Sequence, residues 1–177
     1  MKKNKLEDSL NKLFSNSGYK MVDVSDKNIT HRKALASGEI VLGAEVIKLI
    51  KSKKMPKGDP LSIAEVSGIS GVKKTSELIP LCHPLPLDHI SLHTEINEKK
   101  NSILVYCLVS ANSKTGVEME ALSGVSSALL AIYDLSKIVE PNLKISNTKL
   151  LVKSGGKKGL WINPDGIPDK IKNILKI

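Results

Sequence analysis

A proline-rich loop holds a cysteine and a histidine in a nearly fixed position. Residues 79–86 contain three prolines, which exclude a regular helix or a central strand there. Cys82 and His83 lie between them, and rigid placement is what a catalytic or binding group needs. A structural turn with an incidental histidine is the alternative. A metal site that adds His89 and His93 is disfavoured, because these two lie about 13 Å apart along a strand and their spacing matches no ligand pattern.

Charged residues stand at both ends of a long and mostly apolar segment. Glu118 and Glu120 lie where a helix is expected to begin, and the backbone N–H groups of a helix start stabilise negative charge. Ordinary helix-start preference explains them equally well. Asp134 and Lys137 are three positions apart, and a surface ion pair is the plain explanation. Because their neighbours are apolar or small, a shared cleft is favoured, in which the lysine lowers the pKa of the aspartate or the pair passes protons.

A short basic segment combines glycines with lysines. Lys153, Lys157 and Lys158 stand in and beside the glycine-rich residues 154–159. The spacing is not that of a P-loop, but exposed backbone N–H groups and lysines make phosphate a natural ligand. A solvated basic loop is the alternative. Taken together, the acids, the histidine and the cations, without a redox motif or a dinucleotide fingerprint, indicate proton-transfer chemistry on a phosphorylated small molecule.

Hydrophobic periodicity predicts the elements that position these residues. Helices are expected at 43–54, from Pro60 (capped by Asp59) to about 69, at 72–78 and at 116–139. Strands are expected at 21–24, 89–97, 102–111 and 145–153, the middle two as a hairpin. An extended arm is expected after residue 24, through Arg32. This order fits an α+β layer with an antiparallel sheet and helices packed on one side.

The composition is that of one ordinary globular domain. The 177 residues carry a net charge of +9, but Arg32 is the one arginine, and about half of the excess lies in residues 1–20 and 169–177. With aromatic residues at 3%, stacking platforms for nucleic acid are nearly absent, so a nucleic-acid binder ranks last among the functions considered. No apolar run approaches the roughly 20 residues that cross a bilayer, and the basic start lacks the apolar stretch of a secretory signal. We expect a cytoplasmic protein without membrane contact, with residues 1–20 mobile or loosely helical.

Six sequence blocks stand in a characteristic order. They are MVDVS at 21–25, KGD at 57–59, LIPLCHPL at 78–85, KTGVEMEAL at 114–122, IYD at 132–134 and KSGGK at 153–157. These blocks resemble the molybdenum-cofactor biosynthesis protein C family. The resemblance runs over residues 21–159, so we expect a domain there, an N-terminal extension at 1–20 and a C-terminal extension at 160–177. It implies a ferredoxin-like α+β fold and a homohexamer, a trimer of dimers with active sites at subunit interfaces.

The resemblance also implies an enzyme of molybdenum-cofactor biosynthesis. The family's substrate is the cyclic dihydro-GTP intermediate that a preceding radical enzyme makes from GTP. Its product is cyclic pyranopterin monophosphate, formed by proton transfers that open and reclose a ring and by attack of a ribose hydroxyl on the α-phosphate, with release of pyrophosphate. The resemblance implies no cofactor and no protein-bound metal. It leaves open whether Mg²⁺ accompanies the triphosphate. A non-catalytic assembly factor that binds phosphate ligands is the alternative.

The family's functional positions map onto this chain one by one. Asp134 matches its catalytic acid/base, and Lys137, Lys57 and His83 complete the catalytic set. The substrate-binding positions are matched by Leu81, Cys82, His83, Glu118, Met119, Glu120, Lys73, Lys153 and Arg32. Arg32 corresponds to the arginine that helps to complete the neighbouring subunit's site. Its planar guanidinium grips phosphate with two hydrogen bonds, which lysine cannot do.

One distance constrains how these residues meet. Glu120 and Asp134 are 14 positions apart, which is about 21 Å along a straight helix. One small substrate would not reach both. Either Met119 and Glu120 precede the regular helix, or the two ends of the helix serve the active sites of different subunits.

Overall fold

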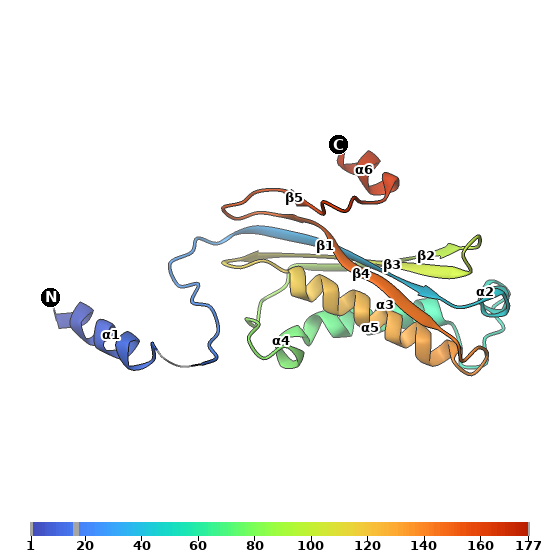
Figure 1. The fold of residues 1–177 in the computed structure, drawn as a ribbon, viewed down its shortest axis with the longest axis horizontal. Coiled ribbons are helices and arrows are strands. Elements are labelled where there is room, and N and C mark those ends of the chain that lie inside the picture. Colours follow the sequence, from blue (N-terminus) through green and yellow to red (C-terminus); the bar gives the residue numbers. More distant parts are fainter. Residues whose placement is uncertain (1, 16–17, 177) are drawn as a thin grey trace.

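Six elements form the centre of the molecule (Figure 1). The computed structural model describes residues 2–15 and 18–176. In chain order the elements are β1 (Thr30–Val41), α3 (Pro60–Lys73), β2 (His89–Asn97), β3 (Ser102–Ser113), α5 (Glu118–Ser136) and β4 (Lys144–Ser154). The sheet has the order β2-β3-β1-β4-β5, antiparallel throughout, where β5 is the short strand Trp161–Ile162. With α3 and α5 against one face, this is the expected ferredoxin-like α+β fold.

Strand β1 is an element that the sequence analysis missed. It pairs with β3 on one side and with β4 on the other, so it lies in the interior of the sheet. We expected an extended arm through Arg32 and no strand after it. The stretch contains Ala34, Ala36 and Gly38, residue types with low strand propensity, and pairing on both sides overrides that preference. The short strand expected at 21–24 is also wrong, because these residues form neither strand nor helix.

Small residues let α5 approach the middle of β1 closely. A Cβ added at Gly38 would lie 2.7 Å from Leu129 Cδ1 and 2.8 Å from Val125 Cγ1, both on α5. Ala34 and Ala36, on the same face of β1, are fully buried. The apolar core between sheet and helices includes Ile40, Ile103, Val105, Val109, Val125, Leu129 and Ile132. The small side chains of β1 therefore reflect the helix that packs on them.

The predicted helices and the hairpin are confirmed, with shifted ends. Two shorter helices accompany α3 and α5, namely α2 (Ala44–Lys51) and α4 (Thr75–Leu78). Helix α3 begins at Pro60, where the side chain of Asp59 accepts a hydrogen bond from Leu61 N at 3.0 Å, as expected of a cap. It continues to Lys73, beyond the expected end at 69.

Helix α5 is one continuous helix of 19 residues. It begins at Glu118, so Met119 and Glu120 lie in its first turn and do not precede it. Glu120 and Asp134 are therefore about 21 Å apart along the helix axis. The first of the two alternatives drawn from the sequence is wrong. The charged groups at the two ends of α5 cannot contact one small ligand within one chain.

The C-terminal residues cover part of the other face of the sheet. Helix α6 (Asp169–Leu175) lies on the side opposite to α3 and α5 (Figure 1). On this face Ile167 is clustered with Tyr106 of β3 and Leu151 of β4. Lys170 Nζ pairs with Glu95 Oε2 of β2 at 3.1 Å. The residues expected to form a C-terminal extension thus build a second, smaller hydrophobic cluster.

The N-terminal residues contain a helix as well. Helix α1 (Lys2–Leu13) falls within the segment expected to be mobile or loosely helical. Its side chains Leu6, Leu10 and Leu13 are exposed. Within residues 2–15 and 18–176, no helix combines the length and the apolar character needed to cross a membrane.

Candidate functional site

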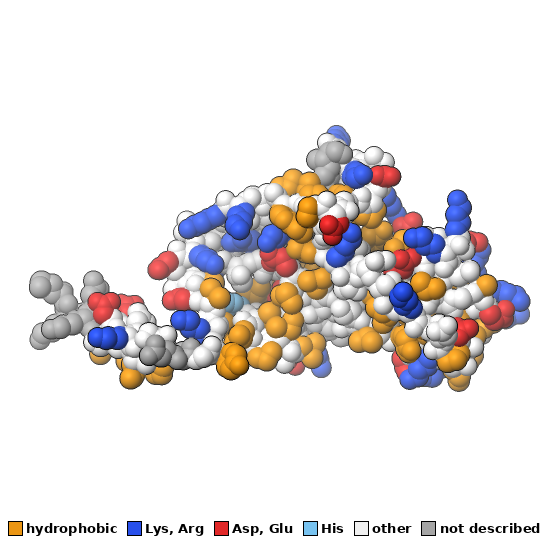
Figure 2. Space-filling model, viewed as in Figure 1, with side chains coloured by type: hydrophobic (Ala, Val, Ile, Leu, Met, Phe, Trp, Pro, Cys, Tyr) orange, Lys and Arg blue, Asp and Glu red, His pale blue; other side chains and the backbone are white. Residues whose placement is uncertain are grey.

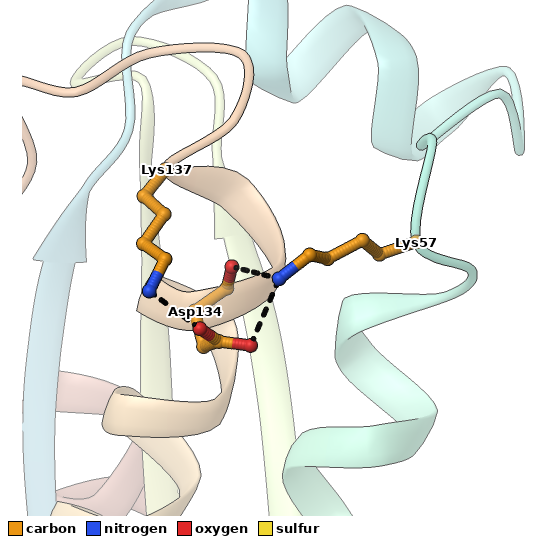
Figure 3. Close-up of polar contacts among 3 residues, drawn as sticks. All are labelled: Lys57, Asp134 and Lys137. Atoms are coloured by element: carbon orange, nitrogen blue, oxygen red, sulfur yellow. Dashed lines mark hydrogen bonds and ion pairs between the residues drawn. The ribbon is translucent and has the colours of Figure 1, made fainter.

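Three charged side chains meet at the C-terminal end of α5 (Figure 3). Asp134 lies in the last turn of α5, and Lys57 reaches it from the turn that precedes α3. Lys57 Nζ is 3.2 Å from Asp134 Oδ2, and Lys137 Nζ is 2.7 Å from Asp134 Oδ1. Lys57 also donates a hydrogen bond to the backbone carbonyl of Asp134 at 3.4 Å. We call these three predicted residues the Asp134 cluster.

The lysines fix the protonation of the Asp134 cluster. Hydrogen bonds from Lys137 and then from Lys57 hold the pKa of Asp134 below its usual value. The same carboxylate raises the pKa of Lys137. At neutral pH, Asp134 is therefore a carboxylate and Lys137 an ammonium group. Such a pair offers a proton acceptor directly beside a proton donor.

A basic cleft of about 540 Å³ lies at the other end of α5, where Glu118 lines it. Its walls come from the arm before β1, the start of β1, the β3–α5 connection and the glycine-rich residues 153–159. Seven lysine or arginine side chains and two carboxylates line it. Figure 2 shows Lys and Arg side chains gathered over this end of the sheet. We call this feature the basic cleft, and its charge suits an anionic ligand.

Arg32 is held in the basic cleft by backbone carbonyls. Its Nε donates to Ser113 O and its Nη2 to Lys114 O, each at 3.3 Å. Gly156 lies against the guanidinium at φ +72°, and an added Cβ there would clash with it. A side chain at this position would be strained and would displace Arg32. The predicted Lys153 is in the same cleft, with its Nζ 2.8 Å from Glu118 Oε1.

The proline-rich loop lies near the first turn of α5. Glu120 is buried there, and burial, followed by the charge of Glu118, raises its pKa. Burial and the nearby Glu120 in turn raise the pKa of the Cys82 thiol. The thiol therefore stays protonated at neutral pH and is not prepared as a nucleophile. His83 Nε2 lies 2.8 Å from the carbonyl oxygen of Val22.

The remaining predicted residues lie at the same end of α5 as the basic cleft. Leu81 and Met119 are 50% and 39% exposed. Lys73 is exposed at the last residue of α3, which runs antiparallel to α5 and so ends near its start. The structure thus separates the predicted site into two groups. The Asp134 cluster is at one end of α5, and all other predicted residues are toward the opposite end.

Sequence reasoning missed several cations of the basic cleft. Lys27 and Lys33 line it beside Arg32, and Lys114 does so from the β3–α5 connection. Lys114 stands in one of the sequence blocks, which is a signal that points to it. Nothing in the sequence marked Lys27 or Lys33, because their place depends on how β1 enters the sheet.

The structure places His93 beside a residue of the smaller hydrophobic cluster. The His93 ring stacks on Tyr106, with ring centroids 6.3 Å apart, and Tyr106 belongs to the cluster on the other face of the sheet. In the described part of the chain, no three His, Cys, Asp or Glu side chains are grouped so that they could hold a metal ion.

Known relatives match this chain over most of its length. The model of the MoaC family matches residues 21–156, which include the Asp134 cluster and most of the basic cleft. The cyclic pyranopterin monophosphate synthase of Clostridium perfringens is 48% identical over 147 residues, which cover 82% of this chain and 93% of the relative. The proteins of the same name from Chloroflexus aurantiacus and Heliobacterium modesticaldum are 45% and 40% identical, over 82% and 89% of this chain and 89% and 99% of their own lengths. The chain belongs to the MoaC family.

Proposed function

We propose that this chain is a cytoplasmic enzyme that converts the cyclic dihydro-GTP intermediate into cyclic pyranopterin monophosphate and pyrophosphate, in molybdenum-cofactor biosynthesis. The observation that carries the proposal is that relatives matched over about nine-tenths of their length or more bear the name of this synthase. The same names favour an enzyme over a non-catalytic assembly factor. The basic cleft supports a substrate with a triphosphate, because seven cations line it.

The chemistry divides between the two ends of α5. In the basic cleft, the cations bind the triphosphate while a ribose hydroxyl attacks the α-phosphate and releases its proton to solvent. The bond from the α-phosphorus to the oxygen that bridges it to the β-phosphate breaks, and pyrophosphate leaves with that oxygen. Preorganised cations stabilise this developing charge. In the Asp134 cluster, Asp134 accepts protons and Lys137 donates them while the ring opens and recloses.

We infer that each active site is shared between two copies of the chain. The two groups of residues are about 21 Å apart along α5, farther than one small substrate reaches. The outer surface of α3 and α5 is apolar and open, with Ile63, Val66 and Leu130 at 45%, 63% and 62% exposure. Figure 2 shows hydrophobic side chains along this side of the body. Exposed apolar surface of this kind marks interaction sites, and a second copy that covers it brings one Asp134 cluster toward the other's basic cleft.

This pairing gives dimers, and a second interface between dimers gives the homohexamer that the family resemblance implies, a trimer of dimers. We propose that no resident cofactor takes part, because neither proton transfer nor displacement at the α-phosphate changes an oxidation state. Mg²⁺ enters this proposal as a counterion of the triphosphate, the form in which it commonly meets nucleotides.

The direct test is to mix the purified protein with the cyclic dihydro-GTP intermediate and to follow pyrophosphate and pterin together. Joint appearance of both products is the expected result. Binding without turnover would favour the assembly factor, and absence of binding would reject the proposal. A nucleic-acid binder would instead show binding to oligonucleotides with a steep dependence on salt concentration.

A further inference from the structure

We propose that residues 22–25 hold the His83 imidazole in one tautomer, with the proton on Nε2 and the free lone pair on Nδ1, and that Asp23 is the positioning residue for this segment. The inference rests on the proposed function, because the family resemblance makes His83 a catalytic position. It adds which ring nitrogen of His83 faces the substrate. It also adds Asp23, to which the family resemblance gives no role, as the residue that sets the tautomer.

The contact between His83 and Val22 determines the tautomer. His83 Nε2 lies 2.8 Å from the Val22 carbonyl oxygen. A carbonyl oxygen can only accept a hydrogen bond, so Nε2 must carry the hydrogen. A neutral imidazole has one N–H group, and the hydrogen bond at one nitrogen fixes the state of the other. Nδ1 is therefore the acceptor that His83 offers to a substrate proton.

The segment that supplies this carbonyl is shaped by Asp23. Asp23 Oδ1 accepts hydrogen bonds from Ser25 N at 2.8 Å and from Ser25 Oγ at 2.6 Å. These bonds close a local turn directly after Val22. They also hold the pKa of Asp23 below its usual value, so the carboxylate remains an acceptor at neutral pH. Asp23 thus sets the direction of the neighbouring Val22 carbonyl without touching His83.

A second bond ties the same segment to the basic cleft. Lys114 Nζ donates to the Ser25 carbonyl oxygen at 2.8 Å, and Lys114 lines the cleft. Val22 and Ser25 therefore connect the proline-rich loop to the phosphate-binding region. Because Lys114 also has a direct place in the cleft, replacing it would disturb binding as well. Asp23 is the cleaner probe, since its hydrogen bonds stay within the segment.

The test compares Asp23→Ala with Asp23→Asn in the full chain. Asparagine keeps the oxygen that accepts both bonds from Ser25, whereas alanine removes it. Asp8→Ala, an exposed carboxylate in α1, is the control for loss of one negative charge in the N-terminal residues. The first readout is the nitrogen-15 NMR signature of the His83 ring at a pH where the ring is neutral, assigned with His83→Gln. The second readout is kcat and KM for the cyclic dihydro-GTP intermediate.

We expect a single tautomer with protonated Nε2 in the wild type, in Asp23→Asn and in Asp8→Ala, and a tautomer mixture in Asp23→Ala. The alanine variant should lose about tenfold in kcat with little change in KM, and asparagine should restore it. Protonated Nδ1 in the wild type, or unchanged kcat and a single tautomer in Asp23→Ala, would overturn the inference. The NMR readout is independent of turnover. An inactive wild type with protonated Nε2 would therefore reject the proposed function and still support the positioning.

Discussion

Asp134 has a separate ammonium partner for each of its carboxylate oxygens. Lys137 binds Oδ1 and Lys57 binds Oδ2, and together they lower the pKa of the acid. A general acid must carry a proton at the working pH, which a carboxyl group with a lowered pKa does not. Lys137, whose pKa is raised, does carry one. Within the Asp134 cluster we therefore assign the acceptor role to Asp134 and the donor role to Lys137.

Replacing Asp134 by asparagine should remove turnover and leave the fold intact. The amide keeps the shape but cannot accept a proton, so kcat should fall at least about 100-fold. Exposed ion pairs contribute little to stability, so the melting temperature should change by only a few degrees. Pyrophosphate release and thermal melting measure the two effects. Glu45→Gln is the matched control, because Glu45 forms an exposed pair with Lys48 at the same helical spacing. Turnover near the wild-type rate in Asp134→Asn would exclude the acceptor role.

Glu120 gives a prediction with a defined pH dependence. Burial raises its pKa, so the folded state favours the protonated acid. Ionised Glu120 therefore destabilises the folded state, and this loss of stability grows as the pH rises through the folded pKa. Glu120→Gln should therefore stabilise the protein at pH 8 by roughly 1 kcal/mol, or about 2–4 °C in Tm. Below about pH 4, where both states are protonated, the advantage should vanish. Melting curves at both pH values test this, with the exposed Glu65→Gln as control. A stability gain of Glu120→Gln that is larger at acidic pH than at pH 8 would contradict a raised pKa of Glu120.

Elements with a local signal were predictable, and β1 was not. Asp59 followed by Pro60 marks the start of α3, and the polar residues 98–101 mark the hairpin. In β1, by contrast, small residues are selected by α5, and the partner strands lie far away in the sequence, as in the pair Gly38↔Val105. No local pattern carries that information.

In the candidate site, too, some contacts follow from local sequence and others do not. Asp134 and Lys137 share a helix face, so their pairing follows from spacing. Lys57 joins them across 77 positions, and only the antiparallel packing of α3 on α5 places it there. Its role was expected from the family resemblance and not from its surroundings. The hydrogen bond between His83 and the Val22 carbonyl, 61 positions apart in the sequence, had no local signal either.

Gly38→Ala tests the close approach of α5 to β1. An added Cβ would lie 2.7 Å from Leu129 Cδ1, so the helix or the side chain must move. Overpacking of this kind costs about 1–3 kcal/mol, which chemical denaturation should detect as a lower midpoint. Gly18→Ala is the control, because nothing lies within 4 Å of its added Cβ. Equal stability of both variants would show that the contact is not as tight as described.

At the scale of the whole molecule, we propose that one chain presents two half-sites. The Asp134 cluster and the basic cleft stand at opposite ends of α5, with exposed Ile63, Val66 and Leu130 on the layer of α3 and α5. An enzyme that acts on one small substrate needs both halves in one place. We propose that association of copies through the apolar surface supplies both, which would account for the exposure of this surface in a single chain.

Complementation between two inactive variants tests this central claim most directly. Asp134→Asn damages one half-site, and Lys153→Met removes a cation from the other. Coexpressed in equal amounts, the variants should assemble so that one site in four receives both intact halves, which predicts about a quarter of the wild-type turnover. Each variant alone should be inactive. If mass spectrometry shows mixed assemblies and turnover still does not rise above that of the single variants, the shared active site is contradicted.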